Sequence, residues 1–197
     1  MPRLVLINGA PASGKSTLAQ MYVDEHPLTL ALDIDVVRAM LGRWLDDPVA
    51  AGLAARRMAI AMARVQLSAG RDVLVPQFLG RIDFVLELEH LARETGADFV
   101  EVVLLSGAQD AADRFARRSR HPETSAHRDA QALQDRSGGP EGLLAMHARL
   151  LEVVAARPRT VTVTTTDGEI AQAYRALVAQ IDAAAPRHPR PRGARRE

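Results

Sequence analysis

The sequence predicts an α/β fold in three layers, with one sheet of five parallel strands and helices on both of its faces. Apolar runs of strand length alternate along the chain with longer helical segments, the order that produces parallel sheets. The opening run is rich in Val, Leu and Ile at consecutive positions, as in a strand buried on both faces. The length of 197 residues favours one domain, which we expect to cover residues 1–185.

The first half of the chain supplies three of the predicted strands. Residues 3–8 read RLVLIN, and a helix begins near Gly14, directly after a cluster of small residues. The next apolar run, LTLALDID, predicts a second strand, and glycines end the two helices that follow it. The predicted boundaries are 28–35 for the second strand, 36–41 and 48–70 for the helices, and 72–78 for the third strand.

The second half continues the alternation. A helix with one apolar face ends at Gly96, and the run FVEVVLL after it predicts the fourth strand. Two further helices lie on either side of a polar stretch, and a strand and a closing helix complete the domain. The predicted boundaries are 81–96 for the first helix, 99–105 for the strand, 109–118 and 141–155 for the next helices, 159–165 for the fifth strand, and 169–183 for the last helix.

The stretch between the first strand and the first helix has the pattern G-x-x-x-x-G-K-[ST]. Its glycines let successive N–H groups point inward at an anion, and the start of the helix adds its positive dipole end. The lysine of such a loop reaches the β- and γ-phosphates, and the serine hydroxyl holds Mg²⁺. We therefore expect this loop to bind ATP through Gly9, Ala10, Pro11, Ala12, Ser13, Gly14, Lys15, Ser16 and Thr17.

Lys15 is the only lysine in a chain that contains 24 arginines. The sequence uses arginine wherever a general positive charge suffices, so a lysine at this position indicates that arginine does not serve there. Lysine is a compact charge on a flexible stem, whereas arginine is a wide planar fork. The site around Lys15 is therefore expected to be narrow.

Two carboxylates follow the second predicted strand. Asp33 and Asp35 are two residues apart, so in an extended chain both point into one cleft, and Arg38 follows one helical turn later. Transfer of a phosphoryl group to a hydroxyl needs one carboxylate to orient or deprotonate that hydroxyl and often a second one near Mg²⁺. We assign the metal to Asp33 and the hydroxyl to Asp35. The alternative for Asp35 is an N-cap of the helix 36–41.

The third predicted strand ends in Pro-Gln-Phe, without the aspartate that often binds metal at this position. This absence places more weight on Asp33 as a metal residue. Gln77 would face the same cleft and could bind substrate, together with Arg81 at the start of the next helix. The alternative for Gln77 is a loop side chain in solvent.

An arginine-rich segment covers residues 113–129. Arg114, Arg117 and Arg118 are spaced i, i+3, i+4 and therefore share one helix face. A lid near residues 113–139 that closes over ATP would bring these arginines to the charge developing on the γ-phosphoryl group. The alternative is a solvated helix end, because arginine is the usual charge of this chain.

Three segments of the chain, NGAPASGKST, LDIDVVR and RFARRSR, resemble the small P-loop kinases. This group includes shikimate and gluconate kinases, chloramphenicol phosphotransferase and the kinase domain of polynucleotide kinases. The resemblance implies a P-loop NTPase fold like that of adenylate kinase. The segment VPQFLGR is more similar to the P-loop tunicamycin-resistance proteins, which leaves the acceptor open.

The resemblance also implies roles for individual residues. Asp35 would contact the acceptor hydroxyl with Asp33 as its partner, and Arg38 would bind substrate or phosphate. The lid residues Arg117 and Arg118 would hold the phosphates. The loop after the last strand would border the adenine through Thr165 and Asp167.

The sequence thus predicts an ATP- and Mg²⁺-dependent kinase that phosphorylates a hydroxyl of a small molecule, such as an antibiotic or a nucleoside-like or sugar-like metabolite. A polynucleotide 5′-hydroxyl kinase is the first alternative, supported only by the basic tail 186–197, which we expect to be disordered. A protein that sequesters a drug and hydrolyses ATP slowly is the second. The sequence predicts no signal peptide and no membrane segment, so we expect the protein in the cytoplasm. The chain has no cysteine, so cysteine usage carries no information on the redox compartment.

Overall fold

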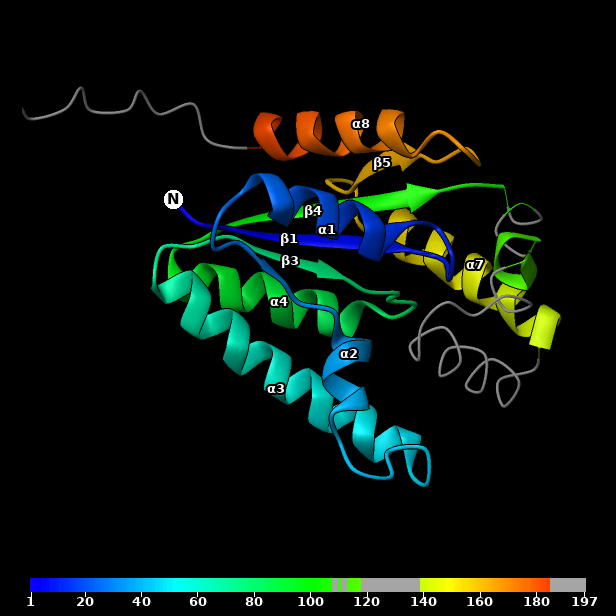
Figure 1. Cartoon of the computed structure of the whole chain (residues 1–197), viewed down its shortest axis with the longest axis horizontal. Coiled ribbons are helices and arrows are strands. Elements are labelled where there is room, and N and C mark those ends of the chain that lie inside the picture. Colours follow the sequence, from blue (N-terminus) through cyan, green and yellow to red (C-terminus); the bar gives the residue numbers. More distant parts are fainter. Residues whose placement is uncertain (108–109, 111–112, 118–138, 185–197) are drawn as a thin grey trace, which may run out of the picture.

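The computed structural model describes residues 1–107, 110, 113–117 and 139–184. Within them, one parallel sheet has the strand order β2-β3-β1-β4-β5, so that β1 lies at its centre (Figure 1). The strands are β1 (Arg3–Gly9), β2 (Leu30–Ala31), β3 (Val73–Pro76), β4 (Asp98–Leu105) and β5 (Val161–Thr164). The predicted three-layer α/β fold with five parallel strands is confirmed.

Helices cover both faces of the sheet (Figure 1). One hydrophobic cluster joins the sheet to α1 and α8, and a second cluster joins it to α2, α3 and α4. The helices are α1 (Lys15–Glu25), α2 (Ile34–Ala39), α3 (Pro48–Ser68), α4 (Ile82–Thr95), α7 (Gly139–Ala156) and α8 (Ile170–Ala183). In the part of the chain that the structure describes, no helix is long and apolar enough to cross a membrane.

The central strand explains why its sequence is apolar at consecutive positions. Leu4 and Leu6 pack into the cluster with α3 and α4, while Val5 and Ile7 pack into the cluster with α1 and α8. All four side chains are fully buried. Because successive side chains of a strand point to opposite faces, a sheet covered on both sides requires apolar residues at every position.

The main departure from the predicted boundaries lies after β2. The strand expected over 28–35 is limited to Leu30–Ala31, and α2 begins at Ile34, not at residue 36. Asp33 is the residue that starts this helix, because its side chain accepts a hydrogen bond from the N–H of Asp35. The chain therefore turns into a helix directly after β2. This happens at the carboxyl ends of the parallel strands, where the phosphate-binding loop after β1 also lies.

Two predicted segments fall partly or wholly outside the described residues. Of the arginine-rich helix expected near 109–118, residues 113–117 are helical, and the remainder of the predicted lid up to residue 138 is not described. The tail 186–197 also lies outside the described residues.

Candidate functional site

The phosphate-binding loop connects the end of β1 to the start of α1, at the centre of the sheet. Gly14 has a φ of 92°, and Ala12 has a φ of 62°, which a residue with a Cβ rarely adopts. A Cβ on Gly9 would lie 2.6 Å from Ser13 Oγ and 3.0 Å from the carbonyl oxygen of Leu104. The loop therefore has the tight, partly left-handed backbone that allows N–H groups to converge on an anion.

The Lys15 ammonium group lies over this loop. Its Nζ donates hydrogen bonds of 2.9 Å to the carbonyl oxygen of Gly9 and 2.8 Å to that of Ala10. These bonds direct the positive charge toward the first residues of the loop. The ammonium group of Lys15 is therefore held at the loop that is expected to bind phosphate.

Ser16 and Asp33 are brought together from two parts of the chain. Ser16 Oγ donates a hydrogen bond of 2.8 Å to Asp33 Oδ2. Burial, and then the nearby Asp35 carboxylate, raise the pKa of Asp33, while the hydrogen bonds from Ser16 and from the backbone act in the opposite direction. A cation between this hydroxyl and this carboxylate would relieve both unfavourable effects.

The residues present fit Mg²⁺. Among the described residues, no group of three or more His, Cys, Asp or Glu side chains could hold a metal ion by itself. Mg²⁺ usually keeps several waters and uses only one or two carboxylates together with substrate phosphates. A hydroxyl on the phosphate loop and one neighbouring carboxylate are the protein part of such a site.

Asp35 and Arg38 form an ion pair on α2, with 3.0 Å between Asp35 Oδ1 and Arg38 Nη2. The Arg38 guanidinium also lies over the Trp44 ring, 4.6 Å from its centroid. The Asp35 side chain is half exposed, whereas that of Arg38 is 14% exposed. The alternative that Asp35 caps this helix is wrong because Asp33 occupies the cap position, which leaves the Asp35 carboxylate accessible.

Asn8, which sequence reasoning missed, connects the phosphate loop to the loop after β3. Its Oδ1 accepts hydrogen bonds from the N–H groups of Gly9 and Leu79, at 2.8 and 2.9 Å. Its Nδ2 donates to the carbonyl oxygen of Leu79, at 3.0 Å. The side chain is fully buried, although the residue is polar and stands next to the last position of an apolar strand. A polar residue at the end of an apolar run and directly before Gly9 was the feature of the sequence that could have indicated this role.

The loop after β3 also holds Gln77 and Arg81. Gln77 donates its backbone N–H to the carbonyl oxygen of Ile7, and its buried side-chain Oε1 has no hydrogen-bond partner in the described structure. The alternative of a glutamine side chain in solvent is therefore wrong for this atom. Arg81 is the residue before α4 and lines a pocket of about 200 Å³ beside this loop.

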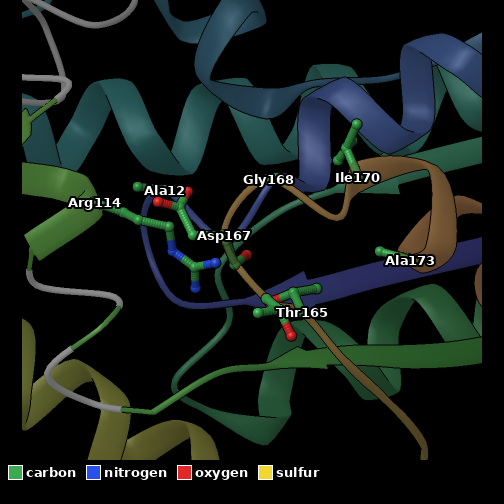
Figure 2. A pocket seen from close by; sticks show the side chains of 10 residues that line it. Ala12, Arg114, Thr165, Asp167, Gly168, Ile170 and Ala173 are labelled. Carbon is green, nitrogen blue, oxygen red and sulfur yellow. The ribbon is translucent and has the colours of Figure 1, made fainter.

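A second pocket, of about 180 Å³, borders the phosphate loop at Ala12, Ser13 and Gly14 (Figure 2). Arg114 extends into it from the side opposite Ile170 and Ala173. The Nε and Nη2 atoms of Arg114 are buried and have no hydrogen-bond partner among the described residues. The pocket is lined by Ala12, Ser13, Gly14, Arg114, Thr165, Thr166, Asp167, Gly168, Ile170 and Ala173.

The described end of the arginine-rich segment is tied to the same pocket. Arg117 Nη2 lies 2.7 Å from Asp167 Oδ2, and both side chains are more than half exposed. Arg117 is therefore paired with the loop after β5. Arg118 lies outside the described residues, so its predicted role stays a prediction.

Residues 4–140 match the model of a protein family described as an AAA domain. The chain belongs to this family. No curated protein matches it. The match is not limited to the phosphate loop, because it extends from β1 past the end of β4.

Solved kinase structures share the fold. A gluconokinase from Sinorhizobium meliloti 1021 superposes with a TM-score of 0.60 at 18% identity, over 92% of this chain and 93% of that chain. The APS kinase of Mycobacterium tuberculosis, in complex with AMPPNP and APS, gives 0.58 at 19% identity, over 92% and 98%. The expected similarity to small P-loop kinases is thereby confirmed at the level of the fold.

Proposed function

We propose that this protein is an ATP-dependent kinase that transfers the γ-phosphoryl group to a hydroxyl of a small molecule. The observation that supports this most is the position of the phosphate loop between two pockets. One pocket includes residues 165–168, after β5, and the other lies at the loop after β3, on the opposite side of β1. In parallel sheets ligands bind beyond the carboxyl ends of the strands, so donor and acceptor would meet at this loop.

ATP would occupy the phosphate loop and the pocket beside it. Residues 9–17 would hold the phosphates, with Lys15 moving from the Gly9 and Ala10 carbonyls to the β- and γ-phosphates. The unpartnered guanidinium atoms of Arg114 would bind a phosphate oxygen. Thr165 and Asp167 would lie beside the nucleoside part of ATP. The APS kinase structure in complex with AMPPNP, which has the same fold, supports the binding of a nucleotide.

Ser16 and Asp33 would hold Mg²⁺, which neutralises charge on the transferred phosphoryl group when it is bound. Asp33 also caps α2, so the residue that would hold the ion starts the helix that carries Asp35. The ends of β1 and β2 would in this way be held together around the reacting atoms.

Asp35 would act as the base. Its carboxylate is accessible, and the Arg38 ion pair fixes its direction. The acceptor hydroxyl oxygen would form a bond to the γ-phosphorus, the bond between that phosphorus and the bridging oxygen of ADP would break, and the hydroxyl proton would pass to Asp35. Gln77 and Arg81, at the neighbouring loop, would position the acceptor.

Residues 1–185 would form the kinase domain, with a lid near 113–139. The Arg117–Asp167 ion pair supports contact between the base of this lid and the nucleotide pocket. Closure over ATP would let Arg117 exchange Asp167 for a phosphate. We place the protein in the cytoplasm, with small molecules rather than nucleic acid as its partners.

The test is a screen of hydroxyl-bearing compounds incubated with the protein, ATP and Mg²⁺ and analysed by mass spectrometry. We expect at least one compound to gain a phosphoryl group in an ATP-dependent manner, and the Lys15→Ala variant to abolish the product. Formation of ADP without any phosphorylated compound would support the ATP-hydrolysing alternative and refute the proposal.

A further inference from the structure

The pocket beside the loop after β3 contains three arginines. It is lined by Arg56, Phe78, Leu79, Gly80, Arg81 and Arg149 and has a volume of about 200 Å³. The arginines come from three separate helical elements, since Arg56 lies on α3, Arg81 directly before α4 and Arg149 on α7. No acidic residue is among the residues that line the pocket. Three arginines, all of them exposed, therefore line one hollow that a small molecule can enter.

These charges are not balanced by ion pairs. Within the described ranges, Arg56, Arg81 and Arg149 form no ion pair and donate no side-chain hydrogen bond. In contrast, Arg38 and Arg157 are each paired with a carboxylate. The exposed Arg56 guanidinium lies 5.2 Å from the centroid of the Phe84 ring, which restricts its position without neutralising it.

The backbone at this pocket adds to the positive potential. Helix α4 begins here, and its N-cap residue, Arg81, makes no side-chain cap hydrogen bond. The first N–H groups of a helix and the positive end of its dipole both favour an anion. Asp83, in the first turn, is exposed and does not pair with the pocket arginines.

Gly80 gives the pocket its shape. A Cβ on this residue would lie 2.9 Å from the Phe78 ring and 3.3 Å from the Arg149 Cβ, so a side chain here would displace both. Glycine thus allows an aromatic ring and a cationic side chain to approach the same backbone. The ring offers an apolar surface next to the charges.

The pocket is joined directly to the phosphate loop. Leu79, which lines it, is held by its N–H and its carbonyl oxygen to Asn8, the residue before Gly9. Because both loops follow adjacent parallel strands, a molecule in this pocket lies at the same edge of the sheet as the transferred phosphate.

We propose that this pocket binds an anionic group, a carboxylate or a phosphate, of the acceptor whose hydroxyl is phosphorylated. The inference rests on the proposed kinase function and narrows its substrate to hydroxy acids and phosphorylated alcohols. Arginines bind the oxygens of both groups through charge-assisted hydrogen bonds, and Phe78 packs against the carbon skeleton. Cationic acceptors, such as amino-group-rich antibiotics, are disfavoured by the same charges.

The first experiment measures anion binding without catalysis. Inorganic sulfate is titrated by calorimetry onto protein saturated with AMPPNP and Mg²⁺, so that the phosphate loop is already filled. We expect the Arg149→Gln variant to bind sulfate about tenfold more weakly than the unaltered protein, the usual effect of losing one hydrogen bond to a charged group. The matched control is Arg57→Gln, which removes the same charge next to Arg56 from a residue outside the pocket.

Sulfate binding that is absent from the unaltered protein, or equal in the Arg149→Gln and Arg57→Gln variants, overturns the inference. Arg56→Gln provides a second variant if Arg149→Gln fails to fold. Sulfate binding that depends on Arg149 without phosphoryl transfer to any acceptor refutes the kinase function while preserving the anion site.

The second experiment measures transfer to matched pairs of acceptors. Each pair is a hydroxy acid and its amide, or a sugar phosphate and the free sugar. We expect the anionic member to be preferred, with its KM raised about tenfold to a hundredfold in Arg149→Gln and the KM for ATP unchanged. Phosphorylation that favours the neutral members confirms the kinase function and overturns the anionic acceptor.

Discussion

Replacing Asn8 with alanine tests whether one buried amide holds the two loops of the site together. The side chain makes three hydrogen bonds, to the N–H of Gly9 and to the N–H and carbonyl oxygen of Leu79, and is fully buried. Each lost bond has a net cost of about 0.5–1.5 kcal/mol, and a buried group left without a partner costs more. Partial access of water offsets some of this, so we expect a loss of about 2–4 kcal/mol in the free energy of unfolding.

The assays are urea unfolding and thermal unfolding, both followed by far-UV circular dichroism. For a chain of this size, the expected loss corresponds to a decrease of about 5–12 °C in Tm. The matched control is Gln66→Ala, which removes an amide that donates one hydrogen bond to the Leu28 carbonyl oxygen near the surface. Water can replace that bond, so we expect the control to change stability by less than about 1 kcal/mol.

The same variant has a functional readout. Asn8 joins the phosphate loop to the loop after β3, which borders the pocket lined by Arg81. Loss of its side chain is therefore expected to raise both the KM for ATP and the KM for the acceptor. A stability loss under about 1 kcal/mol with both KM values unchanged would show that other contacts position the two loops.

The remaining predictions concern the reacting groups and one buried ion pair. Lys15→Ala is expected to abolish transfer and weaken ATP binding with little change in Tm, measured by calorimetry and thermal unfolding; unchanged turnover would contradict the assigned role. Asp35→Asn should lower turnover by about two to four orders of magnitude, while the free energy of unfolding changes by no more than about 0.5 kcal/mol. Asp33→Ala should cost about 1 kcal/mol through the lost helix cap, and equal stability losses in the Asp33→Ala and Asp35→Ala variants would contradict the observed cap. Arg157→Leu should destabilise by about 3–5 kcal/mol, because it leaves the Glu101 carboxylate, 4% exposed, without its partner. Denaturant unfolding tests this, and the double variant with Glu101→Leu should recover most of the loss.

Local sequence patterns predicted the centre of the molecule correctly. The run at 3–8, the glycine spacing after it and the helix that follows are close together in the chain, so each supports the assignment of the others. The alternation of apolar strands and helices likewise predicted the parallel sheet, because a strand buried on both faces requires consecutive apolar residues. Fold, phosphate loop and the candidate residues on it therefore followed from sequence alone.

The start of α2 shows where local patterns fail. Asp33 and Asp35 are equally good cap residues, and the sequence contains no local signal that separates them. In the structure, Asp33 also accepts a hydrogen bond from Ser16, on the phosphate loop. This contact joins the segments that follow β1 and β2, which are distant in the chain. Only the folded structure could therefore show which carboxylate caps the helix and which remains accessible.

The same distinction applies to the rest of the site. Asn8 forms its hydrogen bonds with Leu79, 71 residues away in the chain. The pocket lined by Arg56, Arg81 and Arg149 likewise brings together residues that are far apart in the sequence. In a chain with 24 arginines, Arg56 and Arg149 are indistinguishable by sequence from solvated surface charges. The fold and the phosphate loop could be predicted because they depend on residues that are neighbours in the chain. The pocket lined by arginines and the contacts of Asn8 became visible only in the folded molecule, because they depend on how distant segments pack around the sheet.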